Sequence, residues 1–233
     1  MRAAWYSHNG EAKDVIVVGE MPTPEPGPGE VRVRLHTSGV NPSDVKSRRA
    51  RPLSDPRIVP HSDGAGVIDA VGTGVDTGRV GERVWIWNGQ WARPMGTASE
   101  WMVLPSVQAV LLPANTDFAA GACLGIPALT AIQAVHLAGD LKDKTVLVTG
   151  ASSAVGHYIT QLVTLAGGRV IGTVGSPAKA EHAKAAGMKE AIFYKTEPVA
   201  ERVKALTAGL GVSVIIDMDF ASTAQLVAAG ALA

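Results

Sequence analysis

The sequence has very little cysteine and few aromatic residues. Cys123 is the only cysteine among 233 residues, so the chain can form neither an internal disulfide nor a cysteine-rich zinc lobe. Phe, Trp and Tyr make up 5% of the chain, although 46% of its residues are hydrophobic. This composition is typical of a soluble globular protein. We expect Cys123, at the start of a predicted helix, to be a small buried side chain.

The sequence also lacks net charge and long apolar runs. Its 21 Lys and Arg residues balance 21 Asp and Glu residues, which gives no electrostatic basis for binding nucleic acid or a membrane surface. No apolar run reaches the length of a transmembrane helix. Residues Met1–Tyr6 turn polar too early for a signal peptide. We therefore expect a cytoplasmic protein whose partner is a small molecule.

The C-terminal half alternates short apolar runs with helical patterns. The apolar runs have the length and β-branched content of buried parallel strands, and they cover residues 144–149, 169–174, 190–194 and 212–217. Helical spacing fills the intervals, over residues 157–166, 177–186 and 198–208. Strands that alternate with amphipathic helices predict an α/β fold with a doubly wound parallel sheet.

A turn of small residues, Gly150–Gly156, joins the first of these strands to its helix. Small side chains let the backbone approach a pyrophosphate, and the N-terminus of the helix stabilises its negative charge. The match to the pattern G-x-G-x-x-G is imperfect, because Ala151 and Ser153 stand where glycines are usual. An ordinary packing turn is the alternative. The strand–turn–helix context favours a dinucleotide-binding turn.

The N-terminal half differs in its proline content and in the length of its apolar runs. It carries most of the prolines, and its apolar runs are short: Val15–Val18, Val31–Leu35, Gly66–Val71, Arg83–Trp87 and Ser99–Leu104. Short strands separated by Gly and Pro predict a β-rich, barrel-like domain. We place the domains at residues 1–122 and 123–233. Trp85 and Trp87 alternate on one strand face, where packing in the barrel core is favoured over lining an aromatic pocket.

The residues after the second strand of the parallel sheet indicate which cofactor is bound. Folds selective for NAD place an acidic residue there to bind the ribose 2′-hydroxyl, but Val174–Ser176 contains none. Ser176 and Lys179 instead offer a hydroxyl and a positive charge for a 2′-phosphate. The simpler interpretation is that Ser176 caps the helix that begins at Pro177 and that Lys179 is solvated. The two interpretations are compatible, and NADPH is favoured over NADH.

Several segments together resemble a known family. They are Ser38–Asp44, Val59–Ile68, Val71–Val75, Gly81–Val84, Asn88–Trp91, Gly96–Glu100, Leu129–Ala131 and Thr149–Gly156. Their order and content resemble the quinone oxidoreductase (ζ-crystallin-like) branch of the medium-chain dehydrogenase/reductase superfamily. The resemblance covers essentially the whole chain. It implies a GroES-like β-barrel followed by a Rossmann domain, with the cofactor in the cleft between them.

The resemblance also implies a chemistry and a set of site residues. Members of this branch use NADPH to reduce quinones, enones or similar electron-poor carbonyl compounds without zinc. Asn41 matches an asparagine that approaches the nicotinamide and the substrate, and is the one catalytic candidate. The matching cofactor-binding residues are Asn41, Thr130, Ser152, Ser153, Ala154, Val155, Gly156, Ser176, Lys179 and Tyr194. For Tyr194, core packing at a strand end is an equally open interpretation.

Zinc-dependent alcohol dehydrogenases of the same superfamily differ at two positions. They carry a cysteine where this chain has Asn41, and a histidine where it has Ser62. His61 lies one residue away, but a single histidine without partner ligands favours a structural role or a pocket wall over metal binding. His61 also replaces a glycine common in the quinone reductases, so the pocket is expected to differ in shape. We expect Asp44 to brace the turn around Asn41.

The chain has fewer strands than a complete doubly wound fold. Four parallel strands are predicted, whereas a complete dinucleotide fold has six. The sequence thus predicts a Rossmann domain that is incomplete at its C-terminus, with an exposed strand edge that favours self-association into a homo-oligomer. Two functions stay open at this point. One is the NADPH-dependent oxidoreductase, and the other is a shortened protein that binds a nucleotide or a partner with little or no turnover.

Overall fold

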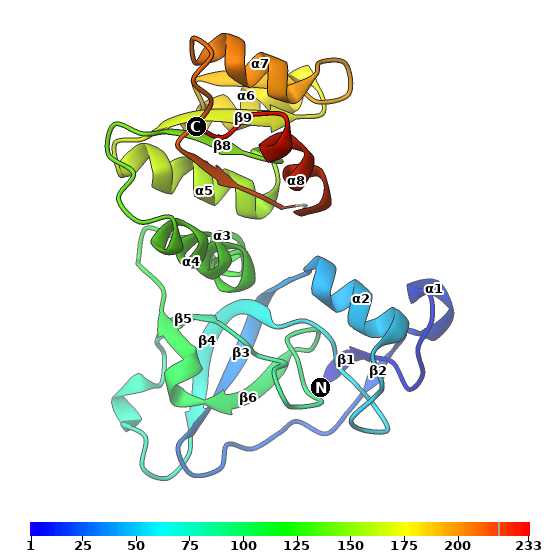
Figure 1. Ribbon diagram of the computed structural model, residues 1–233. Coiled ribbons are helices and arrows are strands. Elements are labelled where there is room, and N and C mark those ends of the chain that lie inside the picture. The colour runs from blue at the N-terminus through cyan, green and yellow to red at the C-terminus, as the bar shows by residue number, and fades with distance from the viewer. Residues whose placement is uncertain (219) are drawn as a thin grey trace. The chain divides into compact units, whose positions relative to one another are not determined.

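The chain folds into two units, Met1–Ile126 (unit 1) and Pro127–Ala233 (unit 2), in a computed structural model that describes residues 1–218 and 220–233 (Figure 1). A π-helical turn, η3 (Leu124–Ala128), connects them. The predicted boundary at residues 122/123 lies just before this turn. None of the helices in the described part of the chain is long and apolar enough to cross a membrane.

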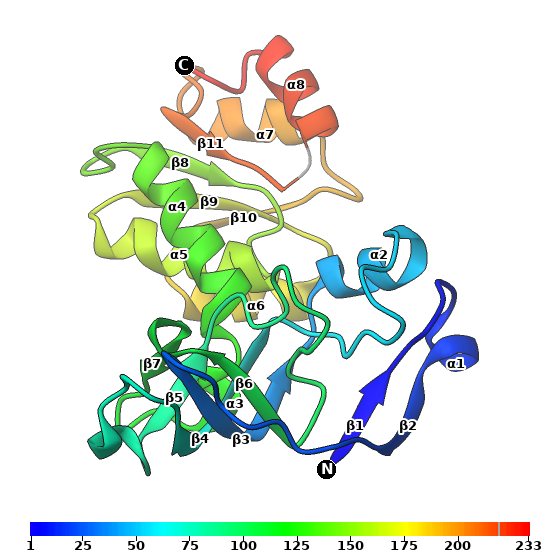
Figure 2. The ribbon, with the colours of Figure 1, turned by 90° about the horizontal axis from the view of Figure 1, so that it is seen from below.

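Unit 1 is built around a five-stranded antiparallel sheet. The sheet has the order β6-β3-β4-β5-β7 and is formed by β3 (Glu30–Gly39), β4 (Asp63–Val71), β5 (Arg83–Ile86), β6 (Trp101–Pro105) and β7 (Ala109–Leu111) (Figure 2). A separate hairpin pairs β1 (Arg2–Trp5) with β2 (Val17–Glu20). The helical elements are α1 (Ala12–Val15), α2 (Pro42–Ala50), α3 (Phe118–Gly121) and two 3₁₀ turns, η1 (Thr77–Arg79) and η2 (Ser106–Gln108). The predicted β-rich first domain is confirmed.

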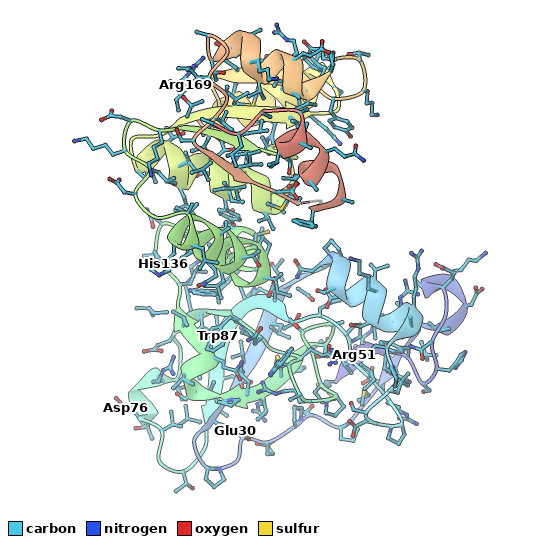
Figure 3. All side chains as sticks on the ribbon, in the orientation of Figure 1. Glu30, Arg51, Asp76, Trp87, His136 and Arg169 are labelled. Atoms are coloured by element: carbon cyan, nitrogen blue, oxygen red, sulfur yellow. The ribbon has the colours of Figure 1, made fainter. Side chains whose placement is uncertain are left out.

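Alternation along β5 decides which side chains form the core of unit 1. Val84 and Ile86 are fully buried with residues of β3, β4 and β6. Because neighbouring residues of a strand point to opposite faces, Trp85 and Trp87 lie on the other face and are half-buried; Figure 3 labels Trp87. Core packing of these two tryptophans is therefore a wrong prediction. The run Val15–Val18 is likewise not one strand, because Val15 ends α1 and β2 begins at Val17.

Unit 2 contains a parallel sheet with helices on both faces. Its strands have the order β10-β9-β8-β11 and are β8 (Thr145–Val148), β9 (Arg169–Val174), β10 (Glu190–Phe193) and β11 (Val214–Ile216). The helices are α4 (Leu129–Leu137), α5 (Ala154–Leu165), α6 (Pro177–Ala185), α7 (Val199–Leu206) and α8 (Phe220–Ala228). Val146 and Val148 pack with α5 and α6 residues, whereas Leu147 faces residues of α7 and α8. The predicted doubly wound parallel sheet is confirmed.

The β11 edge of this sheet is partly covered by the chain itself. Val212 and Leu232 form a parallel bridge just before β11. The Val212 N–H donates to Ala231 (2.8 Å), and the Ala233 N–H donates to Val212 (2.9 Å). Ala231 is fully buried as a result. Self-association through the remaining edge stays a prediction.

Two local predictions need correction. Helix α5 begins at Ala154, not at His157, because Ser153 caps it and draws part of the predicted loop into its first turn. Cys123 is exposed, which contradicts the expected burial. Gly121 at the end of α3 and Ala122 are buried, but the burial does not extend to Cys123.

Candidate functional site

In unit 1 the site is built around Asn41, the residue that precedes α2. The Asn41 N–H donates to a carboxylate oxygen of Asp44 (2.7 Å), and Pro42 occupies the first helical position. Proline suits that position because it has no N–H to leave unpaired. Asp44 thus braces the turn as expected. The Asn41 amide, 6% exposed, donates through Nδ2 to Oδ2 of Asp63 (2.8 Å), so one of its two amide N–H donors is already engaged.

Asp63 at the start of β4 is the buried acid of this cluster. Its Oδ2 also accepts from the Ile126 N–H (2.9 Å), while Oδ1 is buried and has no hydrogen-bond partner in the described structure. A Cβ at Gly125 would overlap Oδ1, so the backbone closes tightly over the carboxylate. Burial raises the pKa of Asp63 to about 6, against the lowering effect of the hydrogen bonds from Asn41 and Ile126.

In unit 2 the turn after β8 forms a candidate site of its own. Ser153 caps α5 by accepting a hydrogen bond from the Gly156 N–H (3.0 Å), and Gly150 has a φ of +61° that favours glycine. A Cβ at Gly156 would overlap the carbonyl oxygen of Gly150. The turn therefore approaches α5 more closely than any residue other than glycine at position 156 allows. The first N–H groups of a helix have no intrahelical partner, so this end of α5 suits a phosphate.

Thr173 holds the turn from the neighbouring strand, and the sequence prediction missed it. Its Oγ1 accepts from the Gly150 N–H (2.9 Å), and its carbonyl oxygen accepts from the Ala151 N–H (3.1 Å). The signal was present as a polar residue at the end of an apolar strand. The predicted residues Ser152 to Gly156 therefore stand on a turn that two adjacent strands position.

The residues predicted for a 2′-phosphate follow the ends of β9 and β10, with Ser176 and Lys179 at the start of α6 and Tyr194 directly after β10. Ser176 caps α6 by accepting from the Lys179 N–H (3.4 Å), which confirms the capping role. The Tyr194 hydroxyl lies 3.1 Å from where a Cβ of Gly175 would be, and Tyr194 is 52% exposed. Core packing is therefore excluded for Tyr194. The nearest acid, Glu181, pairs with Lys184 (2.9 Å).

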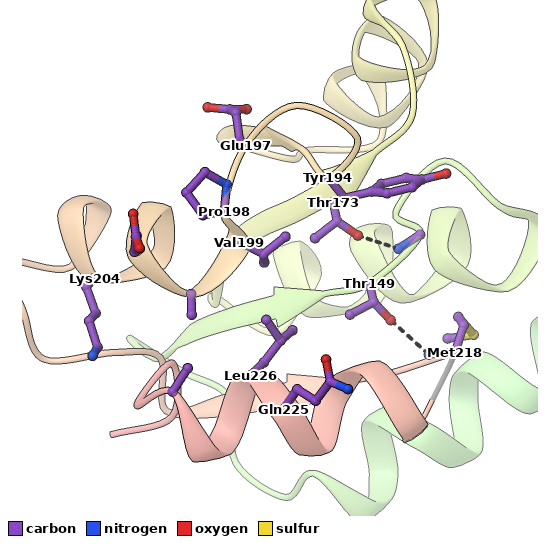
Figure 4. Close-up of a pocket in the computed structure, with 14 residues that line it drawn as sticks. Thr149, Thr173, Tyr194, Glu197, Pro198, Val199, Lys204, Met218, Gln225 and Leu226 are labelled. Carbon is purple, nitrogen blue, oxygen red and sulfur yellow. Dashed lines mark hydrogen bonds between the residues drawn. The ribbon is translucent and has the colours of Figure 1, made fainter.

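A cavity of about 860 Å³ lies next to Tyr194 (Figure 4). It lies over the carboxyl ends of the parallel strands, where ligands bind in doubly wound folds, and Thr149, Thr173 and Tyr194 line it. Its far side is formed by α7 and α8, including Leu226. Of the predicted residues of unit 2, Tyr194 lines this cavity, whereas Thr130, Ser152 to Gly156, Ser176 and Lys179 do not.

Comparison with known proteins decides the family. Two family models match, the alcohol dehydrogenase GroES-like domain over residues 27–114 and the zinc-binding dehydrogenase over residues 154–228. A 2-haloacrylate reductase from Burkholderia is 33% identical over 227 residues, and a rat quinone oxidoreductase is 31% identical over 221; each match covers 94% of this chain. The chain belongs to the medium-chain dehydrogenase/reductase superfamily.

Solved structures agree with this assignment. An NAD-dependent alcohol dehydrogenase matches this medium-chain dehydrogenase/reductase with a TM-score of 0.88 and 32% identity, over 100% of this chain and 75% of that one. Escherichia coli quinone oxidoreductase complexed with NADPH matches with a TM-score of 0.82 and 28% identity, over 93% of this chain and 66% of that one. The chain spans 66% of the length of each of the two curated relatives. The resemblance to quinone oxidoreductases is therefore confirmed.

This medium-chain dehydrogenase/reductase has a further polar link that sequence reasoning missed. Thr149 Oγ1 donates to a carboxylate oxygen of Asp217 (2.7 Å) and accepts from the Met218 N–H (2.9 Å). Thr149 follows β8 and Asp217 follows β11, so the link joins the ends of two neighbouring strands beside the cavity. Within the part of the chain that is described, no group of three or more His, Cys, Asp or Glu side chains is arranged to hold a metal ion.

Proposed function

We propose that this chain is an NADPH-dependent, zinc-independent oxidoreductase that reduces a quinone, an enone or a similar electron-poor carbonyl compound. The observation that carries the proposal is the close approach of the Gly150–Gly156 turn to the start of α5, at the carboxyl ends of the parallel strands, where Gly150 borders the cavity. The names of the relatives support the same chemistry, since quinones and 2-haloacrylates are both electron-poor acceptors. The candidate residues are those that the sequence predicts.

The residues of unit 2 fit NADPH. Gly156 and the N-terminus of α5 provide close backbone approach and unpaired N–H groups for the pyrophosphate. We assign the 2′-phosphate to Ser176, Lys179 and Tyr194, of which Ser176 caps α6 and Tyr194 lies against Gly175, while the acid Glu181 is paired with Lys184. A 2′-phosphate would pair with the positive charge of Lys179. NAD-selective sites instead carry an acidic residue that binds the ribose 2′-hydroxyl. The complex of the Escherichia coli relative with NADPH supports this choice.

The bound cofactor would supply the hydride. The chain therefore has to bind the cofactor and the substrate, orient them, and exclude water. We assign an orienting role to Asn41 in unit 1, whose side chain is held by Asp63 and whose backbone is held by Asp44. Thr130 is assigned to the nicotinamide by the family resemblance. Zinc independence rests on the donor set, because an amide at Asn41 and a hydroxyl at Ser62 are poor replacements for the usual cysteine and histidine ligands.

NADPH should bind more tightly than NADH, and Lys179→Ala should remove most of the difference. A hydrogen bond to a charged group is worth about 1–3 kcal/mol, so the variant should lose that amount of NADPH affinity and keep its NADH affinity. Fluorescence titration with both cofactors measures this. Lys184→Ala, near the other end of α6 and paired with Glu181, is the matched control. Equal or tighter NADH binding by the parent protein contradicts the assignment.

The reaction itself is tested by steady-state oxidation of NADPH with 1,4-benzoquinone, phenanthrenequinone and 2-chloroacrylate as acceptors. We expect turnover with at least one acceptor, and the same rate after dialysis against a chelator, because no step needs a metal. Loss of the rate on chelation, restored by zinc, would refute zinc independence. Tight NADPH binding without turnover of any acceptor would favour the nucleotide-binding alternative.

A further inference from the structure

His61 has a backbone conformation that histidine seldom adopts. Its φ is +78°, in the left-handed region that normally belongs to glycine. The surroundings hold it there: the His61 carbonyl accepts from the Thr97 N–H (2.9 Å), and the Ser62 carbonyl accepts from the Gly89 N–H (2.8 Å). A non-glycine residue kept in such a conformation is often part of a functional site. The conformation therefore points to a role for the His61 side chain.

The hydrogen bonds around His61 determine its tautomer. Thr97 Oγ1 donates to the carbonyl oxygen of Asp63 (2.6 Å), an oxygen that can only accept. Its single hydroxyl proton is thereby used, so the 2.8 Å contact with Ser38 Oγ requires Ser38 to donate. The 2.9 Å contact between Ser38 Oγ and His61 Nδ1 then requires Nδ1 to donate. His61 is thus protonated on Nδ1, and its Nε2 carries a lone pair when the ring is neutral.

Nε2 is open to a ligand. It has no hydrogen-bond partner within the described chain and is absent from the buried, unpartnered atoms, so solvent reaches it. Burial of the rest of the ring lowers the pKa of His61 and favours the neutral form. A neutral imidazole with one nitrogen anchored and the other free is the arrangement that proton-transferring histidines use.

The position of His61 links it to Asn41. His61 precedes β4, and Ser38 lies near the end of β3, three residues before Asn41. The ionisable groups on the neighbouring elements are Asp63 on β4, Asp44 on α2 and His36 on β3, which stacks on Phe118 (4.3 Å). Burial, not one of these charges, is what lowers the pKa of His61. The histidine and the candidate orienting amide thus share one end of the unit 1 sheet.

We propose that Nε2 of His61 gives the reduced substrate its proton. The inference rests on the proposed reductase function. When the electrophilic carbon of an enone or quinone gains the hydride, a C–H bond forms and the displaced π-electron pair moves to oxygen. The Nε2–H bond of the imidazolium then breaks and an O–H bond forms. This leaves the neutral, Nδ1-protonated ring that Ser38 stabilises, and solvent water returns the proton to Nε2.

The test combines ring NMR with pH profiles. In the full chain labelled with ¹⁵N-histidine, we expect the His61 Nδ1 resonance of a protonated nitrogen and the Nε2 resonance of an unprotonated one at pH 8. Saturating 1,4-hydroquinone, whose O–H can donate to Nε2, should shift Nε2 alone. In the parent protein, kcat should rise as the pH falls from 8 to 6, since only the protonated ring is active.

Two substitutions suit the backbone at position 61. Glycine and asparagine both tolerate a positive φ, so His61→Gly and His61→Asn should fold and bind NADPH with a dissociation constant within about twofold of the parent. Both should lose roughly 100-fold in kcat at pH 6, which is the low end of general acid–base effects. Both should also lose the pH dependence that His61 causes. Ser38→Ala should keep partial activity. It removes the hydroxyl that holds the proton on Nδ1, so either tautomer can form, but it leaves the imidazole in place.

Each outcome decides the proposal separately from the reductase function. If the parent turns over and the position-61 variants keep its rate and pH profile, any remaining titration belongs to Asp63 and the His61 proposal is wrong. If the parent does not turn over, the reductase function fails. The NMR result still decides the role of His61: an Nε2-protonated ring, or one that hydroquinone leaves unchanged, overturns it.

Discussion

Replacing Gly156 with alanine is expected to destabilise unit 2 by on the order of 2–3 kcal/mol and to weaken NADPH binding by tenfold or more. The added Cβ would overlap the carbonyl oxygen of Gly150. That oxygen belongs to the backbone and cannot rotate away, so the turn and the start of α5 must separate. The hydrogen bond from the Gly156 N–H to Ser153 (3.0 Å) is displaced with them, and so are the N–H groups assigned to the pyrophosphate.

Scanning calorimetry and fluorescence titration with NADPH measure the two effects. Leu165→Ala is the control, because this side chain ends the same helix and is 84% exposed; it should leave stability within about 0.5 kcal/mol and binding unchanged. If Gly156→Ala keeps the parent's stability and NADPH affinity, the close approach of the turn to α5 is not required, and the assignment of the pyrophosphate to this turn loses its main support.

Raising the pH through 6 is expected to reduce the stability of unit 1 through Asp63. Burial raises the pKa of this carboxyl from its ordinary 3.8 to about 6 in the folded chain. Below pH 3.8 both folded and unfolded chains carry the proton, and the stabilising contribution of the neutral group is complete. It is lost as the pH rises through 6. The difference of about 2 pKa units corresponds to on the order of 3 kcal/mol.

Asp63→Asn should remove this pH dependence. The amide oxygen can accept the hydrogen bonds from Asn41 and Ile126 that Oδ2 accepts now, and no charge has to be buried. We expect the variant to exceed the parent by about 1–3 kcal/mol in free energy of unfolding at pH 8 and to match it near pH 4. Denaturant titrations across this range test the expectation. Asp14→Asn, at an exposed position, should follow the parent curve; a flat difference between Asp63→Asn and the parent would show that Asp63 titrates normally.

The parallel sheet of unit 2 could be predicted well because its signals are local. The runs 144–149 and 169–174 consist of β-branched and apolar residues because both faces of these strands are covered by helices. Ser176 before Pro177 marks the start of α6 from the residue types alone. Errors appeared where one face is solvent-exposed or a cap decides the boundary, as at Trp85 and at the start of α5.

The sequence by itself determined the fold class, the family and the candidate residues, because strand periodicity, glycine positions and capping residues act over a few neighbouring positions. Only the tertiary structure decided which polar groups meet. Asp63 binds Asn41 from 22 residues away, Thr173 holds Gly150 from 23 residues away, and Thr97 lies 59 residues from the Ser38 to which it bonds. These pairs depend on strand register and on the path of the loops. No local sequence pattern indicates the register or the loop path. The tautomer of His61 follows from the hydrogen-bonded pairs that they bring together.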